Sequence, residues 1–464
     1  MLLKLKIQEI ISASKWVALY IFLVSFFVLM IFISPPLAFV FSMFLAMIIP
    51  QFWTKNTIYF LFLFLGVFIP LFPDLGVAIG GRVLNWFDLF LLGFGGWNIL
   101  HSFSEQNKKR IDSVLIGSAC FLSVLFLLIF RSPDQMISLR DFVSYLVNFF
   151  LTYYIMEDLK PKQLEKFVAA ILASSCVITL IAFWQKLNGY TFPSEVDGVI
   201  TYRLGVPGTF DDSLVLSMYA GFMVILACMG YVRFARYRLF FSIAILCNLL
   251  SLKLALSRNG MFILGVALGV FILFRFFEWI KDRRKSQLIP ITLVFLPILS
   301  ISSLYLMPKD VYHRIVSVFY LFSGSKNEVI MYNIRSTLGR LENYKAAVKL
   351  FLENPIEGIG LGMYPHLTKF HDADGFYTGL MAETGLIGCM GFSFFVLGVL
   401  YLIKKSYPKL QGESKLFYQL FISLFVALML VSFFEPVFKV QIITFYFFFF
   451  LKNLKQEAQS YESS

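Results

Sequence analysis

Charged residues are scarce in this chain of 464 residues, at 15% of the total, whereas a soluble domain is roughly one quarter charged. Hydrophobic residues make up 59% of the sequence, and the mean hydropathy is +0.77. This balance excludes an ordinary soluble domain. It predicts an all-α integral membrane protein that crosses the bilayer many times.

The sequence also has few of the residues that build disulfides or metal sites. Its five cysteines lie inside apolar runs and form no CxxC pair, so we interpret them as small lipid-facing or core-facing side chains. Its four histidines form neither an HExxH motif nor a cluster with cysteine at metal-ligand spacing. We therefore expect neither a metal site nor a cofactor.

Other motifs that would suggest a function class are missing as well. The glycine-rich stretch PIEGIGLGMY, residues 355–364, lacks the Gly-Lys-Ser/Thr of a nucleotide-binding loop, so we interpret it as a tight, close-packed turn. There is no solenoid repeat and no pair of broken-helix halves typical of inverted-repeat transporters. No cleavable signal peptide is apparent, because residues 1–15 lead directly into an apolar run.

What the chain does contain is a long series of apolar runs. They predict a polytopic bundle of about 12–14 transmembrane helices with a large extracytoplasmic loop. The runs lie at about 16–34, 36–53, 57–72, 86–104, 112–130, 141–157, 167–184, 213–232, 239–257, 260–277, 287–307, 376–403, 416–434 and 438–451. Four regions are expected: an N-terminal bundle (1–184), spans with an arginine-bearing loop (185–307), a large outer loop (308–375), and C-terminal helices with a cytoplasmic tail (376–464).

The formal net charge of +12 has a topological explanation. In a soluble protein it would suggest nucleic acid, but here the basic residues lie in short loops beside apolar runs, so we expect no nucleic-acid partner. Loops on one side carry clusters at 108–110, 281–285 and 404–415, whereas short loops on the other side hold isolated residues such as Arg82 and Lys439. The positive-inside rule therefore predicts that both termini are cytoplasmic.

Two outer segments, 185–212 and 308–375, are too long to be simple turns, and such loops usually carry function. The second contains STLGRLENYKAAVKLFLENP, whose apolar spacing predicts a helix near the membrane surface that ends around Pro355. Four arginines lie on the same outer side, where arginine is unexpected: Arg203, Arg258, Arg335 and Arg340. Because arginine pairs with phosphate in a forked geometry, we interpret them as ligands for a lipid-anchored phosphate or diphosphate. Alternatively, they are solvated or pair locally with Asp211, Asp212, Glu342 and Glu353.

Lys253 and Glu383 lie within apolar runs, where charge is costly. Lys253 precedes Arg258 by five residues; it either supports the site or extends its amine to the membrane interface. Glu383 lies about two turns into the run that follows the outer loop, and we expect a structural hydrogen bond to a neighbouring helix or basic residue.

The polar sequence FHDADG directly precedes the apolar run 376–403, and it contains His371, Asp372 and Asp374. A histidine beside carboxylates suits general base catalysis, because the ordinary histidine pKa lies near the working pH. The alternative is an exposed histidine at the interface.

Taken in order, TYRLGVPGTFDDSLVLSMYA, LALSRNG, STLGRLENYKAAVKLFLENPIEGIGLGMY and AETGLIG resemble the bacterial O-antigen ligase and polymerase superfamily. The resemblance covers roughly 200–392. It implies a C-type, metal-independent membrane glycosyltransferase that uses an undecaprenyl-diphosphate-linked glycan as donor, in the bacterial cytoplasmic membrane. It also implies that Arg203, Arg258 and Arg340 hold the diphosphate or the nearby sugar.

One departure from the family concerns the base. Many members carry a histidine nine residues before the Glu-x-Gly of the next helix, but counting back nine residues from Glu383 reaches Asp374. Either the loop is shifted and His371 is the base, or Asp374 has taken that position. The ordinary histidine pKa slightly favours His371, and both are candidates.

The expected function is a polysaccharide polymerase for O-antigen, capsule or exopolysaccharide that transfers the growing glycan onto a new repeat unit and inverts the anomeric centre. The alternatives are a ligase that transfers the glycan to lipid A core or protein and, from another class, a flippase for lipid-linked sugars. Charges gathered in outer loops favour an enzyme over a flippase, which would need them along a central cavity. Expected partners are the lipid-linked donor and acceptor, the bilayer, and chain-length regulator and flippase proteins.

Overall fold

The structure is a computed structural model that describes residues 112–155, 161–190, 205–210, 212–281, 328–370 and 372–463, with short pieces at 70, 76–79, 82–85, 91–92, 192–196 and 199–203. The chain divides into two compact units, Met1–Thr57 with Asp74–Lys109 and Ile58–Pro73 with Arg110–Ser464. In the first unit, β1 (Gly76–Ile79) and β2 (Arg82–Asn85) form an antiparallel hairpin. The apolar runs predicted at 16–34, 36–53 and 287–307, and most of those at 57–72 and 86–104, lie outside the described residues.

The second unit is built from helices, and its architecture confirms the prediction of an all-α polytopic membrane protein. Within the described residues, six helices are long and apolar enough to cross a membrane. They are α8 (Pro161–Leu187), α9 (Ser213–Arg233), α10 (Arg238–Ala255), α11 (Arg258–Lys281), α16 (Phe376–Ser406) and α17 (Gly412–Val431). Each coincides with a predicted apolar run to within a few residues.

Three predicted runs take other forms. The run at 112–130 is α5 (Ser113–Ile129), a shorter apolar helix that begins where Asp112 accepts a hydrogen bond from Leu115 N at 3.1 Å. The run at 141–157 is interrupted: α6 (Gln135–Leu146) passes through a π-helical turn, η2 (Val147–Leu151), into α7 (Thr152–Ile155). The last run belongs to α18 (Gln441–Ser463), which continues past the apolar sequence into a polar one.

Close packing between α16 and α5 depends on small residues. A methyl group built on Gly398 would lie 2.3 Å from the backbone oxygen of Ser113, and one built on Gly117 would lie 2.6 Å from that of Phe394. Without side chains at these points, the two helices come together as membrane helices do at glycine-rich contacts. Beside this contact, Phe149 lies within aromatic packing distance of Phe121 and Phe395.

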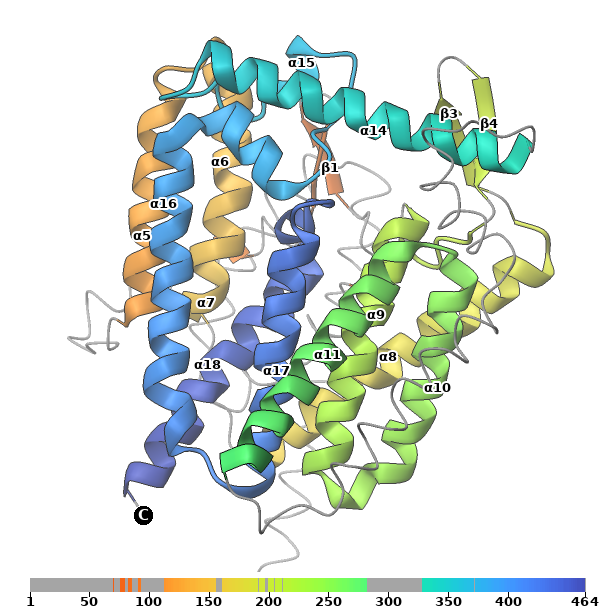
Figure 1. Cartoon of the computed structure of the whole chain (residues 1–464), viewed down its shortest axis with the longest axis vertical. Helices are drawn as coiled ribbons and strands as arrows, with labels where there is room; N and C mark the ends of the chain where they lie inside the picture. Colours follow the sequence, from red (N-terminus) through yellow and green to blue (C-terminus); the bar gives the residue numbers. More distant parts are fainter. Residues whose placement is uncertain are drawn as a thin grey trace, which may run out of the picture. The chain divides into compact units, whose positions relative to one another are not determined.

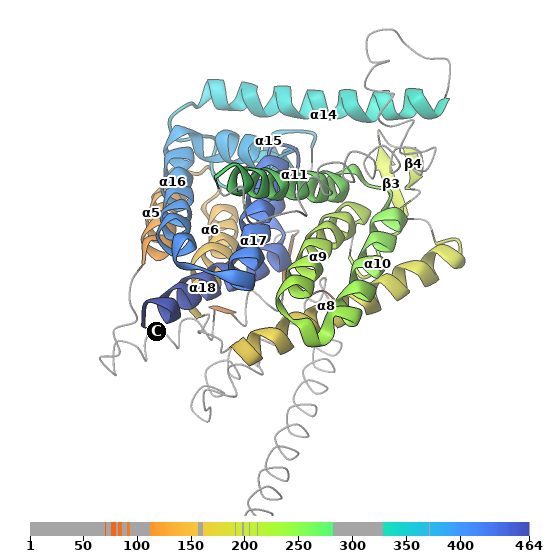
Figure 2. The same cartoon turned by 60° about the horizontal axis from the view of Figure 1, so that its bottom comes forward.

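The segment 308–375, predicted to be an outer loop, contains the predicted helix. It is α14 (Glu328–Glu353), which starts earlier than the motif suggested and ends before Pro355, as predicted. Figures 1 and 2 show α14 crossing the end of the bundle where α16 begins. A short helix, α15 (Tyr364–Leu367), follows it. In the segment 185–212, β3 (Phe192–Val196) and β4 (Val199–Arg203) form an antiparallel hairpin whose register pairs Phe192 with Arg203.

Candidate active site

The helix α16 is broken at Gly385, and a neighbouring segment forms hydrogen bonds with the backbone on both sides of the break. Gly385 has φ 62° and ψ −159°, so the helical hydrogen bonds are interrupted there. The glycine-rich stretch fills the break: Ile359 N donates to Ala382 O and Gly360 N to Glu383 O, both at 3.0 Å, while Leu386 N donates to Pro355 O at 2.9 Å. The close-packed turn predicted for PIEGIGLGMY is therefore confirmed, and its function is to hold the first turns of α16 in place.

Asn343 of α14 holds the polar segment in front of α16. Its side-chain oxygen accepts hydrogen bonds from the Tyr364 hydroxyl at 2.6 Å and from Asp374 N at 3.3 Å. Its amide nitrogen donates to the backbone oxygen of Asp372 at 2.9 Å. Asn343 is buried, so these bonds satisfy a polar group that burial would otherwise penalise. His371 lies outside the described residues, so its place in this segment is not described.

The other side of the segment rests on the chain that follows α17. Phe376 N donates to Ser432 O at 2.8 Å, and the Tyr344 hydroxyl donates to Phe433 O at 3.0 Å. Gly375 has φ 91°, and a methyl group there would lie 2.3 Å from Phe433 O. Asp372 and Asp374 are thus fixed between α14 and the end of α17.

A carboxylate that the sequence prediction missed joins three parts of the chain. Glu435, which follows α17, is 6% exposed. It accepts a hydrogen bond from Asn259 Nδ2 at 2.7 Å and pairs with Arg340 Nη2 at 3.1 Å. The junction therefore connects the first turn of α11, the middle of α14 and the segment after α17. A lone acid in the apolar sequence FFEPVF was the signal that could have identified it.

Electrostatics at this junction keep Arg340 charged and make Asp374 unusual. Burial alone would lower the pKa of Arg340, but Glu435, Asp374 and Tyr344 raise it above its usual value. Burial raises the pKa of Asp374 to about 6; Arg340 opposes this rise, whereas Glu435 and Asp372 add to it. A fixed cation therefore lies beside a carboxyl group that can exchange a proton near neutral pH.

A second basic residue lies behind the polar segment. Lys439 Nζ is 3.5 Å from Asp372 Oδ1. Burial alone would lower the pKa of Lys439, but the surrounding groups, Glu383 first, raise it above its usual value. Glu383 is 2% exposed and interacts electrostatically with Lys439, so its expected hydrogen bond to a neighbouring helix or basic residue stays a prediction. Lys439 thus interacts both with Glu383 of α16 and with the segment that carries Asp372 and Asp374.

The remaining predicted residues are less completely described. Arg258 is the first residue of α11, is half-buried, and directly precedes Asn259 of the junction. Arg203 ends β4, and the segment after it packs against the end of α10, where Val206 N donates to Leu254 O at 3.2 Å. Arg335 lies on α14 before Arg340. Lys253 is exposed in the last turn of α10, and within the described part of the chain no hydrogen bond or ion pair joins it to the junction.

The comparisons with known proteins match one family. The family model described as O-antigen ligase matches residues 243–393, from the first half of α10 to the middle of α16. The matched range contains Arg258, Arg340 and Asp374, whereas Arg203 and Glu435 lie outside it. No curated protein matches the chain.

Proposed function

We propose that this chain, whose residues 243–393 match the family model described as O-antigen ligase, is a bacterial cell-surface polysaccharide polymerase. The family match supports a ligase-type or polymerase-type activity on lipid-linked glycans at a membrane. The proposal goes further: the chain transfers an undecaprenyl-diphosphate-linked glycan onto a repeat-unit acceptor at the outer face of the cytoplasmic membrane. Both chain termini then lie in the cytoplasm, in accord with the positions of the basic loops.

The observation that carries the proposal is the position of Arg340. Glu435 holds one nitrogen of its guanidinium, which has five N–H donors in all, so other donors can reach a ligand. Asp374 acts electrostatically on the same arginine from the mouth of α16. A fixed cation beside a carboxyl group is the pair that a glycosyl transfer from a diphosphate needs.

The reaction then takes place in one displacement. The acceptor hydroxyl oxygen attacks the anomeric carbon of the donor sugar, and the bond from that carbon to the phosphate oxygen breaks. The bonding electrons leave with the diphosphate, the hydroxyl proton goes to the base, and the anomeric centre is inverted. Asp374 suits the base because its pKa is about 6; His371 is the alternative base.

In this proposal the arginines stabilise the negative charge of the leaving diphosphate. The diphosphate gains negative charge as the bond breaks, and donors already fixed in position stabilise that charge without having to reorganise. Arg340 is held by Glu435, and Arg258 lies next to Asn259, which is held by the same carboxylate. Arg203 and Arg335 are proposed as further phosphate or sugar ligands, and the mechanism needs no metal ion.

A ligase is the second candidate, because the family model carries that description. The same residues would perform the same displacement, and the acceptor would be lipid A core or a protein instead of a lipid-linked repeat unit. The two functions differ only in the acceptor that reaches the base.

Glycan analysis of a deletion strain tests the proposal. We expect single repeat units on lipid in place of long chains, and restoration by the wild-type gene. Full-length chains left on undecaprenyl diphosphate would instead identify a ligase, and repeats trapped on the cytoplasmic face would contradict both. Arg340→Ala should reduce chain synthesis by about 10²–10³. Lys345→Ala on the same helix is the matched control, and both variants must reach the membrane in equal amounts.

A further inference from the structure

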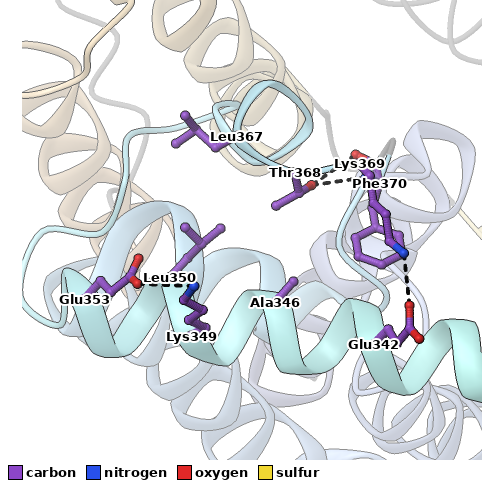
Figure 3. Close-up of a pocket in the computed structure, with 9 residues that line it drawn as sticks. All are labelled: Glu342, Ala346, Lys349, Leu350, Glu353, Leu367, Thr368, Lys369 and Phe370. Carbon is purple, nitrogen blue, oxygen red and sulfur yellow. Dashed lines mark hydrogen bonds and ion pairs between the residues drawn. The ribbon is translucent and has the colours of Figure 1, made fainter.

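A groove runs along α14 on the side away from Tyr344. Figure 3 shows it between this helix and the segment Leu367–Phe370. Its volume is about 350 Å³, which is in the range of small-ligand sites. Phe370 and Leu350 form part of its wall, and charged side chains stand at its rim. Because Phe370 immediately precedes His371, one end of the groove adjoins the segment that carries the proposed base.

The rim contains two ion pairs, each formed by one lysine and one glutamate. Lys369 Nζ is 3.1 Å from Glu342 Oε2, and Lys349 Nζ is 3.8 Å from Glu353 Oε1. All four side chains are more than half exposed. Exposed pairs of this kind contribute little to folding stability, so each partner can exchange its contact for a ligand group at low cost. The groove thus offers carboxylate acceptors and ammonium donors side by side.

This mixture of groups limits what the groove can bind. A free phosphate would meet Glu342 and Glu353 as well as the lysines, so the net attraction is small. A lipid chain would leave the charged rim without polar partners. Hydroxyl groups both donate and accept hydrogen bonds, and thus match both members of each pair. The aromatic ring of Phe370 gives the apolar face of a sugar ring a surface to pack against.

We propose that this groove binds sugar residues of the polysaccharide repeat unit beside the reacting end of the chain. The inference rests on the proposed function, because it takes the glycan as the ligand. In this proposal one sugar packs against Phe370 and Lys369, which directly precede the chain segment that carries Asp374. The following sugars extend along α14 toward Glu353. The bound sugars belong either to the acceptor or to the donor. Both molecules carry the hydroxyl groups and the apolar sugar faces that the groove recognises.

The test measures binding of free oligosaccharide repeat units, released from the polysaccharide of the same strain, to the purified full-length protein in detergent. We expect the double variant Glu342→Ala/Lys349→Ala to bind about tenfold more weakly, because charge-assisted hydrogen bonds are lost. Lys345→Ala removes the same charge from α14 outside the groove and should bind as the wild type does. Equal affinity of the double variant and the wild type would overturn the proposal.

Transfer assays with lipid-linked donor and acceptor separate this inference from the proposed function. An increase of about tenfold in the KM of one substrate, with kcat retained, supports the groove and shows whether it holds the acceptor or the donor. Wild-type transfer with unchanged KM values in the double variant refutes the groove alone. Absence of both transfer and oligosaccharide binding by the wild type refutes the proposed function and the groove together. Arg340→Ala should lose transfer but keep oligosaccharide binding.

Discussion

Asp374 and Glu435 are both acids at the same junction, yet they have different surroundings. Glu435 is almost fully buried and is held by Asn259 and Arg340, which makes it a positioning residue for the arginine. Asp374 is half-buried, and its backbone, through Asp374 N, is held by Asn343. Its carboxyl group is therefore placed by the fold while its pKa is raised toward the working pH.

The first prediction concerns the pH dependence of transfer. Activity should rise as the pH increases through about 6, because only the ionised carboxylate of Asp374 can accept the hydroxyl proton. Asp374→Asn removes the base and should lower turnover by about 10²–10⁴. Initial rates of the wild type and the variant, measured between about pH 5 and 8, check this expectation. Retained activity in Asp374→Asn with loss of activity in His371→Ala would make His371 the base.

A stability measurement serves as the control for that variant. Folding raises the pKa of Asp374 above its usual value, so the fold disfavours the ionised form. Ionisation of Asp374 therefore lowers the free energy of unfolding. This loss begins as the pH rises above the pKa of the unfolded chain and is complete above a pH of about 6. Asp374→Asn should thus be no less stable than the wild type at neutral pH. A lower melting temperature would show that the lost activity reflects damage to the fold.

At the scale of elements, α16 is the clearest case of a helix that depends on a distant part of the chain. The sequence ETGLIG is compatible with a continuous apolar helix, and hydropathy predicts one run over residues 376–403. The break at Gly385 arises because backbone groups of 355–360 pair with both sides of it. Periodicity could not reveal this, because the competing hydrogen-bond partners come from another segment.

The second prediction concerns Gly385→Ala. Its backbone has a positive φ of 62° that disfavours side chains, and an added methyl group would lie 2.3 Å from Ile356 O. We expect a loss of at least about 1–3 kcal/mol in the free energy of unfolding, and loss of transfer because α16 carries the polar segment at its start. Thermal unfolding in detergent measures the first effect.

Gly265→Ala is the matched control, since it lies in α11 with nothing within 4 Å of the added methyl group. It should be neutral or slightly stabilising, by about 0.5–1 kcal/mol. Equal melting temperatures for Gly385→Ala and Gly265→Ala would contradict the account of the break.

At the scale of the whole molecule, the second unit has two ends. The polar segment and α14 lie at the start of α16, and Lys404 and Lys405 lie in its last turn. After the break at Gly385, the continuous part of α16 is residues 386–406, which is about 30 Å long and matches the hydrocarbon core of about 30 Å. We therefore expect the proposed site and these lysines to lie on opposite sides of the membrane.

The third prediction follows from this length. Lys345→Cys on α14 should react with a membrane-impermeant thiol reagent in intact cells, and Lys405→Cys should react only after the membrane is opened. Both side chains are exposed, so access to water decides the outcome. The parent chain is the control, because its five cysteines lie within apolar runs. Labelling in the reverse pattern would invert the proposed topology and contradict a site on the outer face.

By itself, the sequence determined the class of the molecule. Hydropathy and the scarcity of charge are sums over neighbouring residues, so they identify membrane helices without knowledge of any contact. The order of motifs such as LALSRNG and AETGLIG also predicted a resemblance to the family whose model matches residues 243–393, and these residues include Arg258 and Arg340.

Only the tertiary structure decided which of these residues meet. Arg340 and Glu435 are far apart in the chain, and so are Asn343 and Asp374, yet each pair is in contact at the mouth of α16. The break at Gly385 and the raised pKa of Asp374 depend in the same way on segments that fold onto one another. Composition and periodicity describe local preference, whereas the partner of a buried polar group is chosen by the packing of the whole unit.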